Sequence, residues 1–171
     1  MGCYARPEAQ ADSAADGMVA LIDREPYAYR HDPAVPTFDD AGPVTFMDGE
    51  CSLCTWGARL IGRLDRRGEF RICPVQSDLG RAVLTYYGLD PDDPDSWLYL
   101  VDGRAYTSLD AVIRVGRRLG GPARLVLVAA TLPRPLQDWL YRRIARNRYR
   151  LLGRTQMCAL PDPEVRRRLI E

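Results

Sequence analysis

Residues 44–54 combine a short β-prone run with two cysteines: Val44-Thr45-Phe46-Met47-Asp48-Gly49-Glu50-Cys51-Ser52-Leu53-Cys54. The first four residues favour a strand, and Asp48-Gly49 is a turn pair that ends it. After the turn, Gly68 is placed to end a helix whose apolar residues recur at helical spacing, namely Leu53, Trp56, Leu60, Ile61 and Leu64. The stretch therefore predicts a strand that turns directly into a helix, with both cysteines at the junction.

Further along the chain, similar patterns predict strands at residues 70–75, 97–101 and 104–107, and helices at 77–87 and 108–119. Ser77 and Ser108 are expected to cap these two helices. Asp102-Gly103 between the last two strands is the pair that a two-residue hairpin favours. A right-handed crossover makes the first two strands parallel, and the hairpin adds an antiparallel pair. We expect an α/β fold with a mixed four-stranded sheet flanked by helices, in the element order of the thioredoxin core.

Two extra helices are expected after this core, at residues 122–132 and 135–152. The second helix has an apolar stripe, which should pack on the core, and arginines on its other faces; the stripe consists of Leu136, Trp139, Leu140 and Ile144. We divide the chain into three parts. Residues 1–42 form an N-terminal arm that is poorly ordered or packed on the domain. Residues 43–160 form the thioredoxin-like domain with its C-terminal helices, and residues 161–171 form a tail.

The composition excludes several kinds of chemistry. With 171 residues, 46% of them hydrophobic and 27% charged, the chain is typical of one globular domain and needs no disulfides to fold. All of its basic residues except His31 are arginines, so Schiff-base enzymes and Walker-type phosphate sites, which need lysine, are excluded. One histidine excludes a multi-histidine metal centre and argues against a Cys/His catalytic pair. The five cysteines therefore need another explanation.

Positive charge is concentrated at the end of the chain, where residues 114–171 contain 14 arginines and four acidic residues. A solvated helical face explains this distribution, and a non-catalytic module that binds nucleic acid or a membrane surface is the alternative. No apolar run approaches the about 20 residues that a bilayer requires, and the N-terminus lacks a signal-peptide pattern. We expect no membrane span, no nucleic-acid partner and a cytoplasmic, reducing location.

Cys51 and Cys54 form a Cys-x-x-Cys pair at the predicted start of a helix. Unpaired N–H groups and the helix dipole stabilise a thiolate there, and the three-residue step lets the sulfurs meet and cycle between dithiol and disulfide. We expect Cys51, nearer the surface, to attack a substrate disulfide and Cys54 to resolve the mixed disulfide. Asp48 is either the base that accepts the Cys54 proton or an ordinary turn residue. The chemistry requires no organic cofactor, but it needs a protein or small-molecule disulfide and a thiol reductant.

Two other interpretations of the cysteines stay open. In the first, the Cys-x-x-Cys spacing is a coincidence or the two cysteines form a static disulfide. In the second, Cys51 and Cys54 belong to a structural zinc site that Cys73 and Cys158 complete. Cys73 lies in a predicted strand, where a buried apolar role is expected. No role is assigned to Cys3.

The stretch from Phe46 to Cys54 resembles the signature of the DCC family of thiol-disulfide oxidoreductases. This signature is Asp-x-x-Cys-x-x-Cys, usually preceded by an aromatic residue and with glycine after the aspartate. The resemblance covers about residues 43–160, and its further matches are Asp102-Gly103-Arg104, Ala145-Arg146-Asn147-Arg148-Tyr149 and Gly153-Arg154. It implies a thioredoxin-like fold and protein-disulfide reductase activity, with Asp48, Cys51 and Cys54 at the motif positions.

The chain departs from thioredoxins themselves at one position. Thioredoxins place a cis-proline just before the third strand, where the neighbouring backbone holds the substrate. The matching position here is near Ser96, and Pro94 stands two residues earlier. We therefore expect substrate docking to differ from that of thioredoxins.

Overall fold

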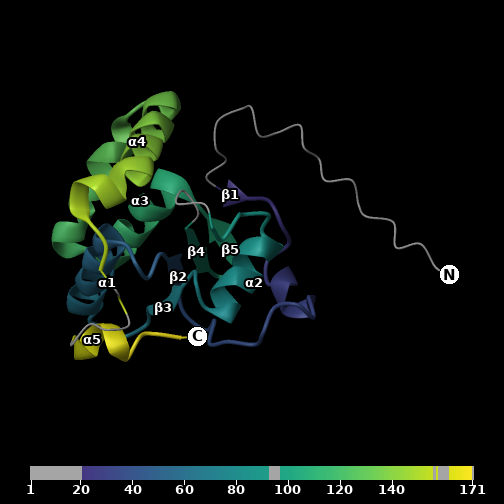
Figure 1. The fold of residues 1–171 in the computed structure, drawn as a ribbon. Coiled ribbons are helices and arrows are strands. Elements are labelled where there is room, and N and C mark those ends of the chain that lie inside the picture. The colour runs from purple at the N-terminus through teal and green to yellow at the C-terminus, as the bar shows by residue number, and fades with distance from the viewer. Residues whose placement is uncertain (1–20, 93–96, 156, 158–161, 171) are drawn as a thin grey trace.

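The β-prone run before the cysteine pair lies in the middle of a mixed sheet with helices on both sides (Figure 1). The computed structural model describes residues 21–92, 97–155, 157 and 162–170. The strands are β1 (Leu21–Ile22), β2 (Val44–Met47), β3 (Arg71–Pro74), β4 (Leu98–Val101) and β5 (Arg104–Tyr106). The α-helices are α1 (Ser52–Leu64), α2 (Asp78–Tyr86), α3 (Ser108–Leu119), α4 (Arg134–Leu152) and α5 (Pro163–Arg166). Two 3-10 helices are η1 (Ala28–His31) and η2 (Gly121–Thr131).

The strand order is β1-β5-β4-β2-β3, with β2 and β3 parallel and the other neighbours antiparallel. The four expected strands, their mixed pairing and the flanking helices are confirmed. Asp102 and Gly103 both have positive φ, 51° and 72°, as a two-residue hairpin requires. The short β1, which was not expected, pairs with β5 and makes a fifth strand at that edge.

Alternating side chains along the strands build a core on each face of the sheet. Phe46 belongs to the cluster beneath α2, whereas Met47 belongs to the cluster beneath α1 and α3. The end of β2 is therefore fixed from both faces of the sheet. Within the described ranges, every helix is too short or too polar to cross a bilayer.

The segment before β2 packs on the α2 face through Tyr29, which is 1% exposed. Its hydroxyl donates to Asp40 Oδ2 at 2.5 Å, and the Arg30 guanidinium donates to both Asp40 oxygens at 2.8 Å. Burial alone raises the pKa of Asp40, but the hydrogen bonds from Arg30 and Tyr29 outweigh it and hold the pKa below its usual value. Part of the arm thus contributes to the core and to a polar cluster.

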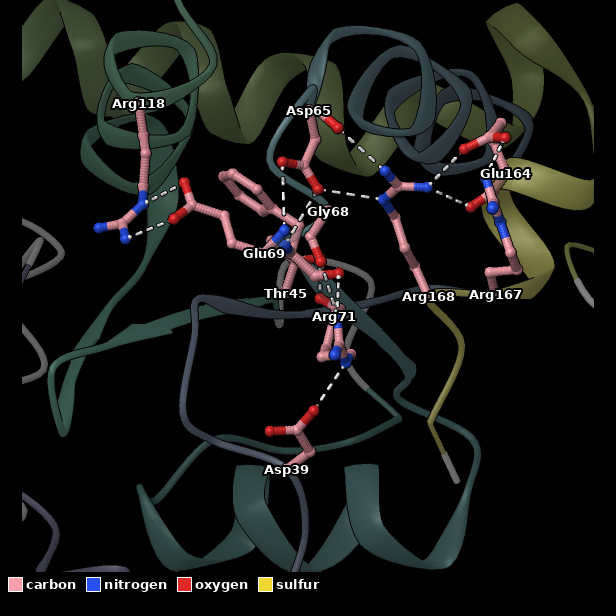
Figure 2. A network of polar contacts seen from close by, with 11 residues as sticks. Asp39, Thr45, Asp65, Gly68, Glu69, Arg71, Arg118, Glu164, Arg167 and Arg168 are labelled. Atoms are coloured by element: carbon pink, nitrogen blue, oxygen red, sulfur yellow. Dashed lines mark hydrogen bonds and ion pairs between the residues drawn. The ribbon is translucent and has the colours of Figure 1, made fainter.

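The C-terminal segment closes the opposite edge of the sheet. Leu169 forms a parallel bridge with Ile72 of β3. Figure 2 shows the Arg168 guanidinium between Asp65, at the end of α1, and Glu164. Arg168 Nε donates to Asp65 Oδ2 at 3.1 Å, and its two terminal nitrogens donate to the Asp65 carbonyl (3.0 Å) and Glu164 Oε2 (2.9 Å). The side chains of the Arg168–Asp65 pair are 7% and 2% exposed, so this ion pair is shielded from water.

Two details of the predicted helices are wrong. Ser77 caps α2 by accepting from Gly80 N (3.1 Å). In α3 the N-cap residue is Thr107, and Ser108 is the first residue of the helix although its φ of 57° lies in the left-handed region. The apolar stripe of α4 does not pack on the core. Leu136, Trp139 and Ile144 are exposed, and the helix buries Gln137 and Ala145 instead.

Candidate active site

The cysteine pair lies where β2 passes into α1, as the sequence predicts. Cys51 is the N-cap residue of α1 with an extended backbone (φ −93°, ψ 125°), and Cys54 follows in the first turn. The Thr55 amide donates to the Cys51 carbonyl at 2.9 Å, which closes that turn. Cys51 and Cys54 approach each other to 3.6 Å. The first turn of the helix therefore brings the two cysteines into contact at its electropositive end.

The exposure of the two cysteines is the reverse of the expectation. Cys51 is fully buried at 0% exposure, whereas Cys54 is half-buried. The prediction that Cys51 lies nearer the surface is wrong, because a segment remote in sequence covers it.

This covering segment comprises residues 153–155 and 157, which we call the strap, and it follows directly after α4. Arg154 forms an antiparallel bridge with Cys51. Three backbone bonds and one bond between hydroxyls join the strap to the turn: Ser52 N to Gly153 O (3.4 Å), Thr155 N to Glu50 O (2.9 Å), Met157 N to Gly49 O (2.6 Å), and Ser52 Oγ with Thr155 Oγ1 (2.8 Å). Met157 is 0% exposed and packs in the cluster beneath α1 and α3. The strap is therefore fixed by side-chain burial as well as by hydrogen bonds.

Asp48 is buried beneath the turn, at 3% exposure. Its Oδ1 accepts hydrogen bonds from Glu50 N (2.8 Å) and from Gln76 Nε2 (2.7 Å). The first bond is typical of an aspartate that shapes a turn, so the turn role considered for Asp48 is present. The role of proton acceptor, which was also considered for Asp48, stays a prediction.

Gln76 is a site residue that the sequence reasoning missed. It follows β3, and its Oε1 accepts from Gly49 N at 3.0 Å while its amide holds Asp48. A Cβ on Gly49 would lie only 3.2 Å from Gln76 Oε1, so a side chain at position 49 would disturb this contact. The carboxyl ends of parallel strands meet at one edge of a sheet, and this rule was the signal available for Gln76.

An ion pair between Arg154 and Glu50 lies at the surface near the two cysteines. Arg154 Nη1 lies 3.9 Å from Glu50 Oε2, and both side chains are largely exposed, at 71% and 54%. Because an exposed ion pair is well screened, it contributes little to stability. It does place an arginine beside the carboxylate that follows Gly49.

The described cysteines do not converge on one metal site. Cys73 is fully buried among the residues beneath α2, with its Sγ 3.3 Å from Ser77 Oγ, and the expected buried apolar role is confirmed. Cys54 packs on the other face of the sheet. Among the described residues, no three His, Cys, Asp or Glu side chains are grouped to bind a metal ion. Cys3 and Cys158 lie outside the described residues, as do Pro94 and Ser96.

Comparison with known proteins agrees with the geometry. Residues 45–154 match the family model described as DCC1-like thiol-disulfide oxidoreductase. The chain is 36% identical over 127 residues to the uncharacterized protein YuxK of Bacillus subtilis (strain 168), covering 74% of this chain and 93% of that protein. It is 31% identical over 123 residues to a chloroplastic DCC family protein of Arabidopsis thaliana, covering 71% of this chain and 72% of the relative. No solved structure matches.

Proposed function

Because the chain belongs to the DCC1-like thiol-disulfide oxidoreductase family, we propose that it is an enzyme that reduces protein disulfides through Cys51 and Cys54. The observation that supports this proposal most directly is the 3.6 Å approach of the two cysteines at the start of α1. A pair at this distance needs only a small movement to form a disulfide. The helix end favours the thiolate, which is the form that attacks.

The reaction is two successive thiol–disulfide exchanges. The Cys51 thiolate attacks one sulfur of the substrate disulfide, and the other substrate sulfur leaves as a thiolate that takes up a proton. Cys54 then loses its proton and attacks Cys51 Sγ, which releases the second substrate thiolate and leaves a Cys51–Cys54 disulfide. A thiol reductant, working in a reducing compartment such as the cytoplasm, returns two electrons and two protons and restores the dithiol.

Cys51 is assigned as the nucleophile because it occupies the N-cap position, where the unpaired N–H groups of the first turn stabilise negative charge. Since Cys51 is fully buried, the strap must move before a substrate sulfur can reach it. The hydrogen bonds to the turn and the burial of Met157 oppose this movement. The same movement exposes the turn that would receive the substrate chain.

Asp48 is proposed as the base that accepts the Cys54 proton in the second step. It is a buried carboxylate in the turn that leads to the cysteine pair, and a carboxylate is a group that can accept a proton when a thiol ionises. Gln76 keeps the carboxylate in place by donating to Oδ1, and we regard it as a positioning residue.

Reduction of insulin by dithiothreitol tests the proposal, with Cys73→Ser as the matched control because Cys73 is equally buried but lies on the other face of the sheet. Cys51→Ser and Cys54→Ser should abolish the acceleration, whereas Cys73→Ser should keep it. Cys54→Ser should also accumulate a mixed disulfide through Cys51. Equal rates for all three variants would refute the enzymatic function, and a trapped complex only with Cys51→Ser would reverse the order of attack.

A further inference from the structure

An exposed apolar surface lies on η2 and α4, outside the redox site. Within the described residues six large apolar side chains are exposed, and five of these lie on the two elements: Leu125, Val128, Leu136, Trp139 and Ile144. Leu125 is 76% exposed, Val128 68% and Trp139 57%. The two elements follow each other in the chain and pack against α3, so they form an outer layer (Figure 1). We call the five side chains and the arginines around them the α4 surface.

Arginines accompany these apolar side chains. Residues 121–150 contain seven arginines and one acidic residue, Asp138. Five of the arginines are exposed and make no ion pair within the ranges that the structure describes, namely Arg124, Arg134, Arg142, Arg143 and Arg150. Apolar side chains and unpaired positive charge therefore lie next to one another.

The side chains of α4 suit a helix that lies at the boundary between water and a membrane. Leu136 and Ile144 are eight residues apart, so their side chains are separated by about 80° around the axis of α4, and Trp139 lies one turn before Arg143. Tryptophan and leucine beside arginine are typical of helices that rest at the boundary between lipid headgroups and acyl chains. The helix is too polar to cross the bilayer, so it would lie along the surface.

Charge complementarity decides between the partners that such a surface can have. Nucleic acid would pair with the arginines but leave Leu125 and Val128 in water. A second copy of the surface would cover the apolar side chains but bring arginines against arginines. An anionic membrane pairs with the arginines and also covers the apolar side chains, because its phosphates lie at the level of the guanidinium groups and its acyl chains lie just beneath. We propose that η2 and α4 dock this protein on a membrane surface rich in anionic lipid.

Co-sedimentation with vesicles tests this docking on the full chain. Vesicles of phosphatidylcholine mixed with phosphatidylglycerol should bind the protein, pure phosphatidylcholine vesicles should not, and added salt should weaken binding. Arg142→Gln/Arg143→Gln should weaken binding about tenfold or more, since each basic residue near an anionic surface contributes appreciably. The matched control, Arg104→Gln/Arg166→Gln, removes two exposed arginines of β5 and α5, which lie away from α4 in Figure 1.

Tryptophan fluorescence supplies a second measurement. The emission of Trp139 should shift to shorter wavelength on the mixed vesicles, so the shift should survive Trp56→Phe and disappear in Trp139→Ser. Equal binding to both kinds of vesicle, or equal losses in the control double variant, would overturn the proposal. DNA binding without vesicle binding, or self-association that buries Trp139 without vesicle binding, would overturn it in favour of those partners. Insulin reduction is measured separately, so either proposal can fail alone.

Discussion

Shortening Met157 should expose Cys51 without unfolding the protein. Met157 is the fully buried anchor of the strap, packed in the cluster beneath α1 and α3. Met157→Ala removes this anchor and leaves the backbone bonds between the strap and the turn possible. If the strap is what buries Cys51, the reaction of Cys51 with a small alkylating reagent should become faster.

The size of the effect follows from the burial of Met157. Truncation of a fully buried methionine to alanine costs about 2–5 kcal/mol. The state in which the strap covers Cys51 loses this stabilisation, whereas the state in which the strap has moved away does not. The free energy of strap opening therefore falls by the same amount. At about 1.4 kcal/mol per factor of ten, even the lower limit predicts roughly a 30-fold faster alkylation of Cys51. Thr155→Val, which removes the hydroxyl bond to Ser52, should accelerate it only about 2–10-fold.

Alkylation is followed for each cysteine-containing peptide by mass spectrometry on the reduced protein. Cys73, which is also 0% exposed, reports global unfolding in the same sample. In the wild type Cys54 should react before Cys51. Thr131→Val is the control for Thr155→Val, since Thr131 makes its hydroxyl bond to Val128 O on η2, away from the strap.

Two results would refute this reasoning. If Cys51 reacts at the same rate in Met157→Ala as in the wild type, the strap is not what protects it. If Cys51 and Cys73 accelerate equally, the substitution has unfolded the domain and local opening is not the cause. The first result refutes the proposal that the strap controls access to the nucleophile, and the second refutes the prediction that Met157→Ala opens the strap without unfolding the protein.

Three further predictions concern the buried Arg168–Asp65 ion pair, the arm and the site. Arg168→Met leaves the Asp65 carboxylate buried without its guanidinium and should lower the free energy of unfolding in urea by about 3–5 kcal/mol. Substitution of its exposed neighbour in Arg167→Met should have little effect, and losses of equal size would contradict a stabilising role for the buried pair. The pKa of Asp40 is lowered in the fold, so its stabilisation is present at neutral pH and lost as pH falls through that pKa. Asp40→Asn should therefore be less stable than the wild type at pH 7, and this difference in stability should close as the pH falls below the ordinary pKa of an aspartate; a difference independent of pH would exclude this ion pair as its cause. Gln76→Leu removes the donor to the motif carboxylate and should slow resolution of the mixed disulfide more than its formation in stopped-flow measurements, and equal slowing would argue against a positioning role.

The order of strands and helices was predictable because local patterns carry it. The β-prone run at residues 44–47, the Asp102-Gly103 turn and the Ser77 cap each act over a few residues, and the structure contains all three. The cap of α3 was mispredicted because two adjacent residues, Thr107 and Ser108, can both serve, and only the backbone conformation chooses between them.

The sequence by itself determined where the two cysteines lie, since a Cys-x-x-Cys pair after a β-prone run places two sulfurs one helical turn apart whatever surrounds them. Tertiary structure alone decided which cysteine is covered, because the strap follows about 100 residues later and no local pattern couples the two segments. It also decided which side of α4 faces the core. An apolar stripe shows that a helix has a preferred side, but only the shape of the neighbouring elements determines whether that side finds protein to pack against.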